Sequence, residues 1–106
     1  MAGQLENRVA VITGAGEGIG RGIASAFVKE GAKVVIAEIN AELGNAAVSD
    51  LGKNAIFVET DVSVKEDNER MIAAAIDQWG TLDILVNNAW GGGVISRVES
   101  KSPELM

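Results

Sequence analysis

The 106-residue sequence contains no histidine, no cysteine and no tyrosine. The missing cysteine excludes a thiol nucleophile and a disulfide framework. Without cysteine and histidine, a zinc site built from these two residue types is also excluded, and we predict no metal site. Histidine and tyrosine are acid–base groups as well, so proton transfer on this chain would require a carboxylate or a lysine.

Positive charge is also scarce, because 9 Lys and Arg stand against 15 Asp and Glu, for a formal net charge of −6. Nucleic-acid phosphates require a basic patch, so we expect no nucleic-acid partner. No apolar run approaches the ~20 residues that cross a bilayer. Residues 1–8 lack the basic segment and long apolar core of a signal peptide. We therefore expect no membrane partner and a cytoplasmic location.

What the sequence does contain is a regular alternation of strand and helix patterns. Four short apolar segments rich in β-branched residues predict strands at residues 8–13, 33–38, 54–59 and 83–86. Three helices are predicted between them, each ending near a glycine: Gly31, Gly52 and Gly80. No linker interrupts the pattern, so we predict a single domain over residues 1–106.

Each predicted helix carries an apolar stripe on one face. We expect Asn40 to cap the second helix, and Ser63 with Glu66 to form a capping box at the third. The three stripes comprise Ile19, Ile23 and Phe27; Leu43, Ala47 and Leu51; and Val64, Ile72, Ile76 and Trp79.

Such alternation is typical of parallel strands joined by right-handed connections, with helices on both faces of the sheet. The predicted strands are almost continuously apolar, as strands buried on both faces are. A solenoid of repeats is disfavoured because the segments share no motif. We predict an α/β fold with a parallel sheet and helices on both of its faces.

A glycine-rich stretch, Thr-Gly-Ala-Gly-Glu-Gly-Ile-Gly at residues 13–20, lies between the first predicted strand and helix. Glycine allows a tight turn and the close approach of a ligand. The N–H groups and positive dipole end of the helix that follows suit an anion such as pyrophosphate. The spacing matches neither Gly-x-Gly-x-x-Gly nor a Walker A loop. The alternative is a turn that simply needs glycine, which four glycines among seven residues disfavour.

Glu38 ends the second predicted strand, 18 residues after Gly20. A carboxylate at about this distance can bind the ribose hydroxyls of a dinucleotide. Its charge and that of Glu17 would repel a 2′-phosphate, and Ile39 adds no positive charge, so NAD is predicted over NADP. Arg21, the one nearby cation, could still accommodate a phosphate. The alternative for Glu38 is a solvated strand end.

Polar residues also follow the third and fourth predicted strands. In an open parallel sheet, ligands lie over the carboxyl ends of the strands. Asp61, followed by Val62, could accept a hydrogen bond from an adenine amino group, although a turn Asp is the alternative. Asn87, Asn88 and Ala89 could hold the glycine turn and line a pocket, although paired Asn residues are also ordinary in turns.

Together these motifs resemble the short-chain dehydrogenase/reductase family, which has the turn Thr-Gly-x-x-x-Gly-x-Gly and an Asn-Asn-Ala-Gly motif after the fourth strand. The resemblance covers essentially the whole chain. It implies a Rossmann-type cofactor half of an NAD-dependent oxidoreductase that moves hydride between nicotinamide and an alcohol or carbonyl substrate, in a protein that is commonly a homo-oligomer.

The resemblance also implies a role for each motif. The glycine turn would hold the pyrophosphate, Glu38 the adenine ribose, and Asp61 with Val62 the adenine. Asn88 and Ala89 would lie near the nicotinamide-side ribose, with Asn87 bracing the turn near Thr13. The predicted cofactor-binding residues are Gly14, Gly16, Glu17, Gly18, Ile19, Gly20, Glu38, Ile39, Asp61, Val62, Asn88 and Ala89.

The sequence departs from the family pattern in two respects. Trp90 replaces the Gly of the fourth-strand motif, and loop packing explains this ring better than a substrate contact does. The family's catalytic Tyr-x-x-x-Lys pair belongs to a second half, and this chain has no tyrosine. We therefore predict no catalytic residue here.

The end of the sequence also suggests that the catalytic half is missing. Residues 102–104 (Ser-Pro-Glu) form a helix-start pattern with almost nothing after it. The fourth strand would also be an exposed apolar sheet edge if nothing paired beyond it. We expect a chain that is truncated before the catalytic half and inactive alone. It would form the first half of a doubly wound parallel sheet, with strand order 3-2-1-4. The alternative is a stand-alone nucleotide-binding module without catalysis.

Overall fold

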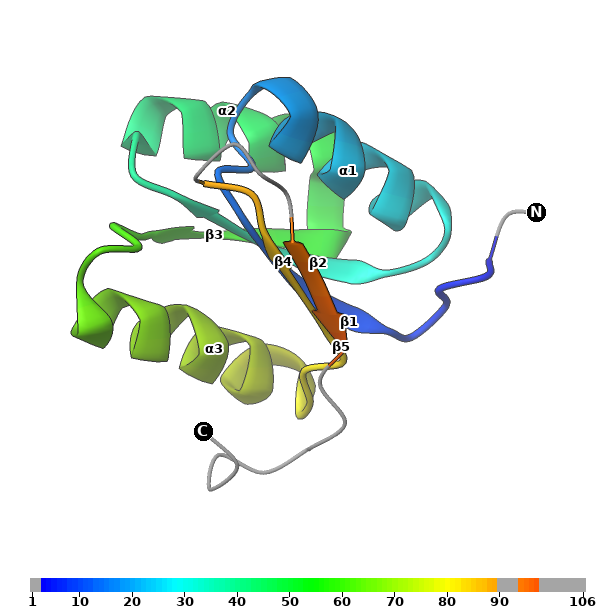
Figure 1. Cartoon of the computed structure of the whole chain (residues 1–106). Helices are drawn as coiled ribbons and strands as arrows, with labels where there is room; N and C mark the ends of the chain where they lie inside the picture. Colours follow the sequence, from blue (N-terminus) through cyan, green and yellow to red (C-terminus); the bar gives the residue numbers. More distant parts are fainter. Residues whose placement is uncertain (1–2, 90–93, 98–106) are drawn as a thin grey trace.

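A five-stranded sheet forms the middle of the computed structural model, which describes residues 3–89 and 94–97 (Figure 1). Its strand order is β3-β2-β1-β4-β5, and neighbours among the first four strands are parallel. The strands are β1 (Val9–Thr13), β2 (Lys33–Glu38), β3 (Ala55–Glu59), β4 (Ile84–Asn87) and β5 (Val94–Arg97). The predicted order 3-2-1-4 and the α/β class are confirmed.

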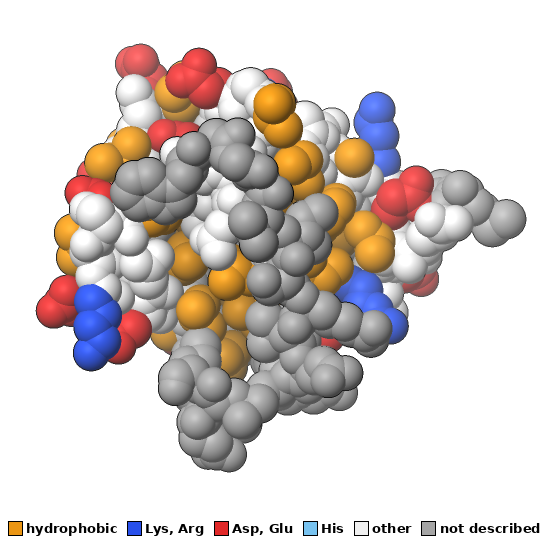
Figure 2. All heavy atoms as spheres, viewed as in Figure 1, with side chains coloured by type: hydrophobic (Ala, Val, Ile, Leu, Met, Phe, Trp, Pro, Cys, Tyr) orange, Lys and Arg blue, Asp and Glu red, His pale blue; other side chains and the backbone are white. Residues whose placement is uncertain are grey.

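Helices cover both faces of this sheet (Figure 1). Helices α1 (Gly18–Lys29) and α2 (Ala41–Leu51) lie on one face, and α3 (Lys65–Trp79) lies on the other. A short 3-10 turn, η1 (Gly52–Asn54), follows α2. In the space-filling view, hydrophobic side chains are visible toward the middle of this face, and most Asp and Glu side chains lie near its rim (Figure 2).

The core consists of two apolar clusters, one on each side of the sheet. Successive strand residues point to opposite faces, so β1 supplies Ile12 to the cluster under α1 and α2, and Val11 to the cluster under α3. Met71 and Ala75 are the buried residues of α3. Every residue of β1 is buried. This agrees with the prediction that the strands are covered on both faces of the sheet.

The strand β5 is not among the predicted strands. It pairs antiparallel with β4, in a register that places Asn87 opposite Val94 and Ile84 opposite Arg97. Since β5 pairs beyond it, β4 is not the exposed sheet edge that it would be without a neighbour. A strand of four residues directly after three consecutive glycines has too short an apolar pattern to be recognised in the sequence.

The helix starts partly follow the predictions. Asn40 caps α2, since its Oδ1 accepts a hydrogen bond from the Leu43 N–H at 3.0 Å. The predicted capping box at α3 is wrong: the N-cap residue is Val64, and the Ser63 hydroxyl donates to Asp61 Oδ1 at 2.6 Å. Val64 is itself exposed, so it does not extend the apolar stripe of α3.

The apolar stripe of α1 begins later than predicted. Ile19 is 74% exposed, whereas Gly20 and Ala24 are the buried residues of this helix. The helix therefore approaches the sheet through its smallest side chains. The helix ends agree with the sequence: Gly31, Gly52 and Gly80 all have positive φ, at 96°, 86° and 82°.

Several sequence features lie outside the described residues. These are Trp90, the glycines at 91–93, and the helix-start pattern at 102–104. Among the helices that the structure describes, none combines the length and the apolar character that a membrane span requires.

Candidate functional site

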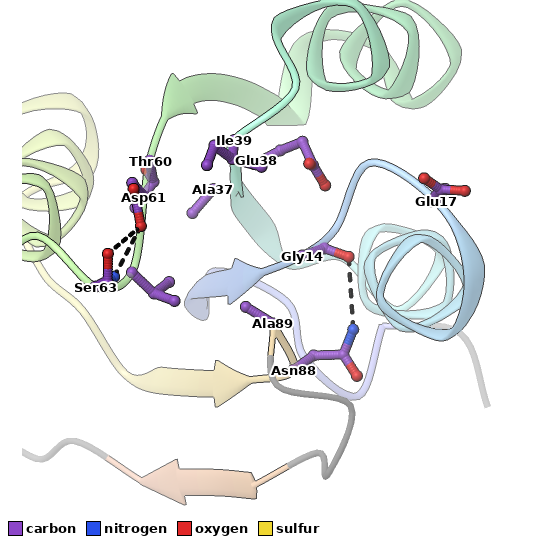
Figure 3. A pocket seen from close by; sticks show the side chains of 11 residues that line it. Gly14, Glu17, Ala37, Glu38, Ile39, Thr60, Asp61, Ser63, Asn88 and Ala89 are labelled. Atoms are coloured by element: carbon purple, nitrogen blue, oxygen red, sulfur yellow. Dashed lines mark hydrogen bonds between the residues drawn. The ribbon is translucent and has the colours of Figure 1, made fainter.

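A cavity of about 530 Å³ lies at the carboxyl ends of the parallel strands (Figure 3). It is bounded by the glycine-rich turn after β1, the end of β2, the segment after β3 and the segment after β4. Its lining consists of Gly14, Glu17, Ala37, Glu38, Ile39, Thr60, Asp61, Val62, Ser63, Asn88 and Ala89.

The glycine-rich turn packs tightly against the sheet. The Gly14 N–H donates to the Ala37 carbonyl at 2.8 Å, which ties the turn to β2. A Cβ on Gly20 would collide with the Gly14 carbonyl oxygen and come within 2.6 Å of Asn88 Nδ2. Gly14 and Gly18 have positive φ, at 64° and 62°. Glycine is therefore needed here both for backbone conformation and for close approach.

The N-terminus of α1 has no side-chain cap. Its N-cap residue, Glu17, makes no side-chain cap hydrogen bond, and no acidic residue lies in its first turn. The first N–H groups of a helix have no partner within the helix and carry the positive end of its dipole. This helix end adjoins the cavity through Glu17, so it can take up a negative group there.

Glu38 connects this turn to the start of α2. It is only 7% exposed, so the alternative of a solvated strand end is wrong. Its Oε1 accepts a hydrogen bond from the Gly16 N–H at 2.9 Å, and its Oε2 accepts one from the Asn40 N–H at 3.0 Å. A Cβ on Gly16 would lie 2.7 Å from Oε1, so only glycine lets the carboxylate approach this closely.

The nearby cation, Arg21, is held on the other side of the turn. Its Nη1 donates to the Gly16 carbonyl at 3.3 Å, and its Nη2 forms an ion pair with Asp50 near the end of α2. Arg21 is not among the residues that line the cavity. Its charge is therefore directed toward Asp50 and the turn backbone.

Thr13 joins the glycine turn to the segment after β4. Its buried Oγ1 accepts hydrogen bonds from the N–H groups of Asn88 and Ala89, at 2.9 and 3.1 Å, and donates to the Val86 carbonyl at 3.3 Å. The Asn88 side chain also makes a long contact of 3.5 Å with the Gly14 carbonyl. In the described residues, Thr13 is thus bonded to the backbone of Asn88 and Ala89, and the expected role of Asn87 stays a prediction.

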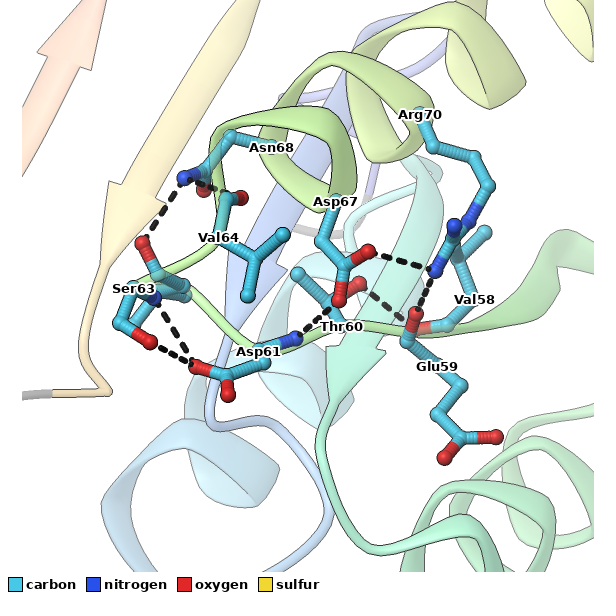
Figure 4. A network of polar contacts seen from close by, with 10 residues as sticks. Val58, Glu59, Thr60, Asp61, Ser63, Val64, Asp67, Asn68 and Arg70 are labelled. Atoms are coloured by element: carbon cyan, nitrogen blue, oxygen red, sulfur yellow. Dashed lines mark hydrogen bonds and ion pairs between the residues drawn. The ribbon is translucent and has the colours of Figure 1, made fainter.

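Asp61 lies on the opposite side of the cavity and is held by Ser63 (Figures 3 and 4). Its Oδ1 accepts hydrogen bonds from the Ser63 hydroxyl at 2.6 Å and from the Ser63 N–H at 3.0 Å. The hydroxyl bond first, and the backbone bond second, hold the pKa of the Asp61 carboxyl below its usual value. Asp61 is therefore a carboxylate at neutral pH and can only accept hydrogen bonds.

The structure brings most of the predicted residues together around one cavity. Gly16, Gly18, Ile19 and Gly20 belong to the turn and the first turn of α1 without lining the cavity, whereas the other eight predicted residues line it. Ala37, Thr60 and Ser63 also line it and were not predicted. Their position at the carboxyl ends of β2 and β3 was the signal that could have identified them. The cofactor roles themselves stay predictions.

Comparison with known proteins gives this arrangement a family context. A family model described as short chain dehydrogenase matches residues 8–104. The sequence is 44% identical over 86 residues to a sorbitol dehydrogenase from Cereibacter sphaeroides, covering 81% of this chain and 34% of the relative. It is 42% identical over 93 residues to a 7alpha-hydroxysteroid dehydrogenase from Escherichia coli (strain K12), covering 85% of this chain and 36% of the relative.

The fold has close structural counterparts as well. The crystal structure of a 3-ketoacyl-(acyl-carrier-protein) reductase from Brucella melitensis, complexed with NADH, superposes with a TM-score of 0.75 at 40% identity. That match covers 77% of this chain and 34% of the reductase. The chain thus spans about a third of the length of the relatives it matches.

Proposed function

This chain belongs to the short-chain dehydrogenase family, and we propose that it supplies the NAD-binding part of an oxidoreductase. The whole protein would transfer a hydride between nicotinamide and an alcohol or carbonyl compound. One observation carries the proposal: the buried Glu38 carboxylate bonds to Gly16 of the glycine turn, beside a helix start that has no side-chain cap.

The residues around the cavity fit a dinucleotide in size and in chemistry. A volume of about 530 Å³ falls within the ordinary range of small-molecule pockets. The open N-terminus of α1 would hold the pyrophosphate. A carboxylate oxygen has two acceptor positions, so both oxygens of Glu38 keep one for a ribose hydroxyl beyond their bonds to Gly16 and Asn40.

The other end of the cavity fits a purine base. Asp61 presents a carboxylate beside Val62, and a carboxylate accepts a hydrogen bond from an exocyclic amino group. Ile39 is 61% exposed and lines the same cavity, so its side chain offers an apolar contact for the base. We propose that Asn88 and Ala89, on the far side of the glycine turn, lie near the nicotinamide-side ribose.

We propose that the cofactor is NAD, with NADP disfavoured by charge. Glu17 and Glu38 both line the cavity, and two carboxylates there would repel a 2′-phosphate. The cation that could offset them, Arg21, is paired with Asp50. The relative solved with NADH supports a nicotinamide cofactor, and the choice between NAD and NADP rests on these charges.

When bound, nicotinamide would supply the hydride-accepting or hydride-donating ring. The residues of this chain bind and orient the dinucleotide and contribute no proton-transferring tyrosine, since the sequence has none. We therefore propose that this chain alone does not turn over a substrate. The alcohol or carbonyl substrate and assembly into a homo-oligomer are proposals for the whole protein.

Calorimetry on the 106-residue chain tests the proposal with NAD and NADP as separate ligands. We expect saturable binding of NAD and weaker binding of NADP. Glu17→Gln removes one negative charge without removing a hydrogen bond of the α1 cap. It should therefore improve the binding of both dinucleotides, and of NADP more than of NAD, because NADP carries the additional 2′-phosphate. Absence of NAD binding by the folded chain would contradict the proposal.

A further inference from the structure

The two carboxylate oxygens of Asp61 differ in their hydrogen bonds. Oδ1 accepts both hydrogen bonds from Ser63, one from the hydroxyl and one from the backbone N–H. In the described part of the chain, no residue donates to Oδ2. Because Asp61 and Ser63 both line the cavity, one oxygen is occupied within the protein and the other is free for a ligand.

The backbone beneath this carboxylate is held separately, by α3 (Figure 4). Asp67 Oδ2 accepts a hydrogen bond from the Asp61 N–H at 2.9 Å, and Asn68 Nδ2 donates to the Val62 carbonyl at 2.8 Å. Arg70 supports this arrangement, since it pairs with Asp67 at 3.1 Å and donates to the Glu59 carbonyl at 2.7 Å. The position of the segment therefore does not depend on the Ser63 hydroxyl.

The Ser63 hydroxyl does not serve the start of α3 either. The N-cap residue of that helix is Val64, with no side-chain cap hydrogen bond. The hydroxyl's hydrogen bond goes to Asp61 Oδ1 alone among the described residues. Among these residues the hydroxyl therefore acts on the Asp61 carboxylate, whose Oδ1 it holds together with the Ser63 N–H.

We propose that Ser63 is a specificity-determining positioning residue, which turns Asp61 so that Oδ2 faces the exocyclic amino group of adenine. This inference rests on the proposed function, because it requires a purine dinucleotide in the cavity. Adenine carries a 6-amino donor, whereas hypoxanthine carries a 6-oxo acceptor, and a carboxylate faces an acceptor unfavourably. Ser63 would therefore contribute to the choice between these two bases.

Calorimetry with NAD and with nicotinamide hypoxanthine dinucleotide tests this, because the two ligands differ only at the purine. We expect the unmodified chain to bind NAD about tenfold or more tightly than the hypoxanthine dinucleotide, since the hydrogen bond to Asp61 involves a charged group. Ser63→Ala should weaken NAD binding roughly three- to tenfold and leave the affinity for the hypoxanthine dinucleotide nearly unchanged.

Two further variants separate this role from a general effect on the fold. Ser63→Thr keeps the hydroxyl and should keep the preference for NAD. Ser49→Ala removes an exposed serine hydroxyl from α2 and should change neither affinity. Circular dichroism on all variants establishes that the helices and the sheet are retained.

The remaining outcomes separate this inference from the proposed function. If Ser63→Ala keeps the full preference for NAD, or weakens both dinucleotides equally, the inference is wrong and the proposed function stands. The same holds if the unmodified chain binds both dinucleotides equally well. If it binds neither, the proposed function fails, and the role of Ser63 fails with it.

Discussion

The hydroxyl of Thr13 accepts the backbone N–H of Asn88 at 2.9 Å, although 75 residues separate the two in sequence. The same oxygen also accepts the Ala89 N–H and donates to the Val86 carbonyl. One buried side chain thus joins the end of β1 to the segment that follows β4. Both segments line the cavity, so this joint determines the relative position of two of its walls.

Replacing Thr13 by valine should therefore destabilise the chain. The two side chains have nearly the same shape, but valine leaves two N–H groups and one carbonyl without their partner. Unpaired buried polar groups cost about 1–3 kcal/mol each, partly offset by water, so we expect a loss of about 2–3 kcal/mol in the free energy of unfolding. Urea unfolding followed by circular dichroism measures it.

Thr81 provides a matched control with the opposite expectation. Its Oγ1 is buried and has no hydrogen-bond partner in the described structure. Thr81→Val removes this unpaired oxygen, so it should leave stability unchanged or raise it by about 1 kcal/mol. Equal losses in the two variants would contradict the role of the Thr13 hydroxyl.

Two glycines of α1 should respond oppositely to alanine. Gly20→Ala places a Cβ against the Gly14 carbonyl and Asn88 Nδ2, whereas Gly22→Ala places one in open space. We expect Gly20→Ala to cost about 1–3 kcal/mol through overpacking and to weaken NAD binding, because the turn must move. Gly22→Ala should stabilise the helix by about 0.5–1 kcal/mol. Thermal unfolding and NAD calorimetry on both variants test this, and a Gly20→Ala variant with unchanged affinity would contradict it.

Asp61 should titrate below 3.8, the ordinary value for its carboxyl, because its hydrogen bonds from Ser63 favour the charged form. A depressed pKa in the folded state means that this contribution to stability is complete above the unfolded value. It is lost as the pH falls through the lower, folded pKa. Carboxyl NMR across acidic pH measures the midpoint, and Ser63→Ala should move it up toward 3.8. A midpoint at or above 3.8 in the unmodified chain would contradict the expected lowering by the Ser63 hydrogen bonds.

Strands and helix ends could be predicted because they follow from short-range patterns, and the strand order because it is the usual order of a doubly wound fold. Continuous apolar segments marked β1 to β3, and Gly31, Gly52 and Gly80 marked the helix ends through their positive φ. The strand β5 could not be predicted, because its four residues carry too short an apolar pattern to indicate a strand that pairs antiparallel with β4. The prediction that Ile19 belongs to the buried stripe of α1 is wrong. Gly20 packs closely against Gly14 and Asn88, and the Ile19 side chain is exposed.

At the candidate site, the sequence predicts which residue types follow the strand ends. Glu38, Asp61 and Asn88 were identified from their positions after strands, and all three line the cavity. Their partners could not be deduced, since these depend on side-chain rotation in three dimensions. Ser63 reads as a helix cap in sequence, yet in the structure its hydroxyl turns back to Asp61.

The preference for NAD should be reversible at the end of β2. Ile39→Arg places a cation at an exposed position that lines the cavity, so alone it should tighten NADP binding. Adding Glu38→Ala removes the nearby negative charge, and together we expect the ratio of NADP to NAD affinity to rise about a hundredfold, since charge-assisted hydrogen bonds contribute about 1.5–3 kcal/mol. Calorimetry with both dinucleotides gives the ratio.

The double variant should also be less stable, for a reason independent of the cofactor. Glu38→Ala leaves the N–H groups of Gly16 and Asn40 without their acceptor, which should cost about 1–3 kcal/mol. Thermal unfolding without ligand measures this cost, and Ile39→Arg alone should not show it. Because the affinity ratio compares two ligands on the same variant, a loss of stability lowers both affinities and cancels. An unchanged ratio would therefore remove Glu38 from the ribose site, whatever the variant's stability.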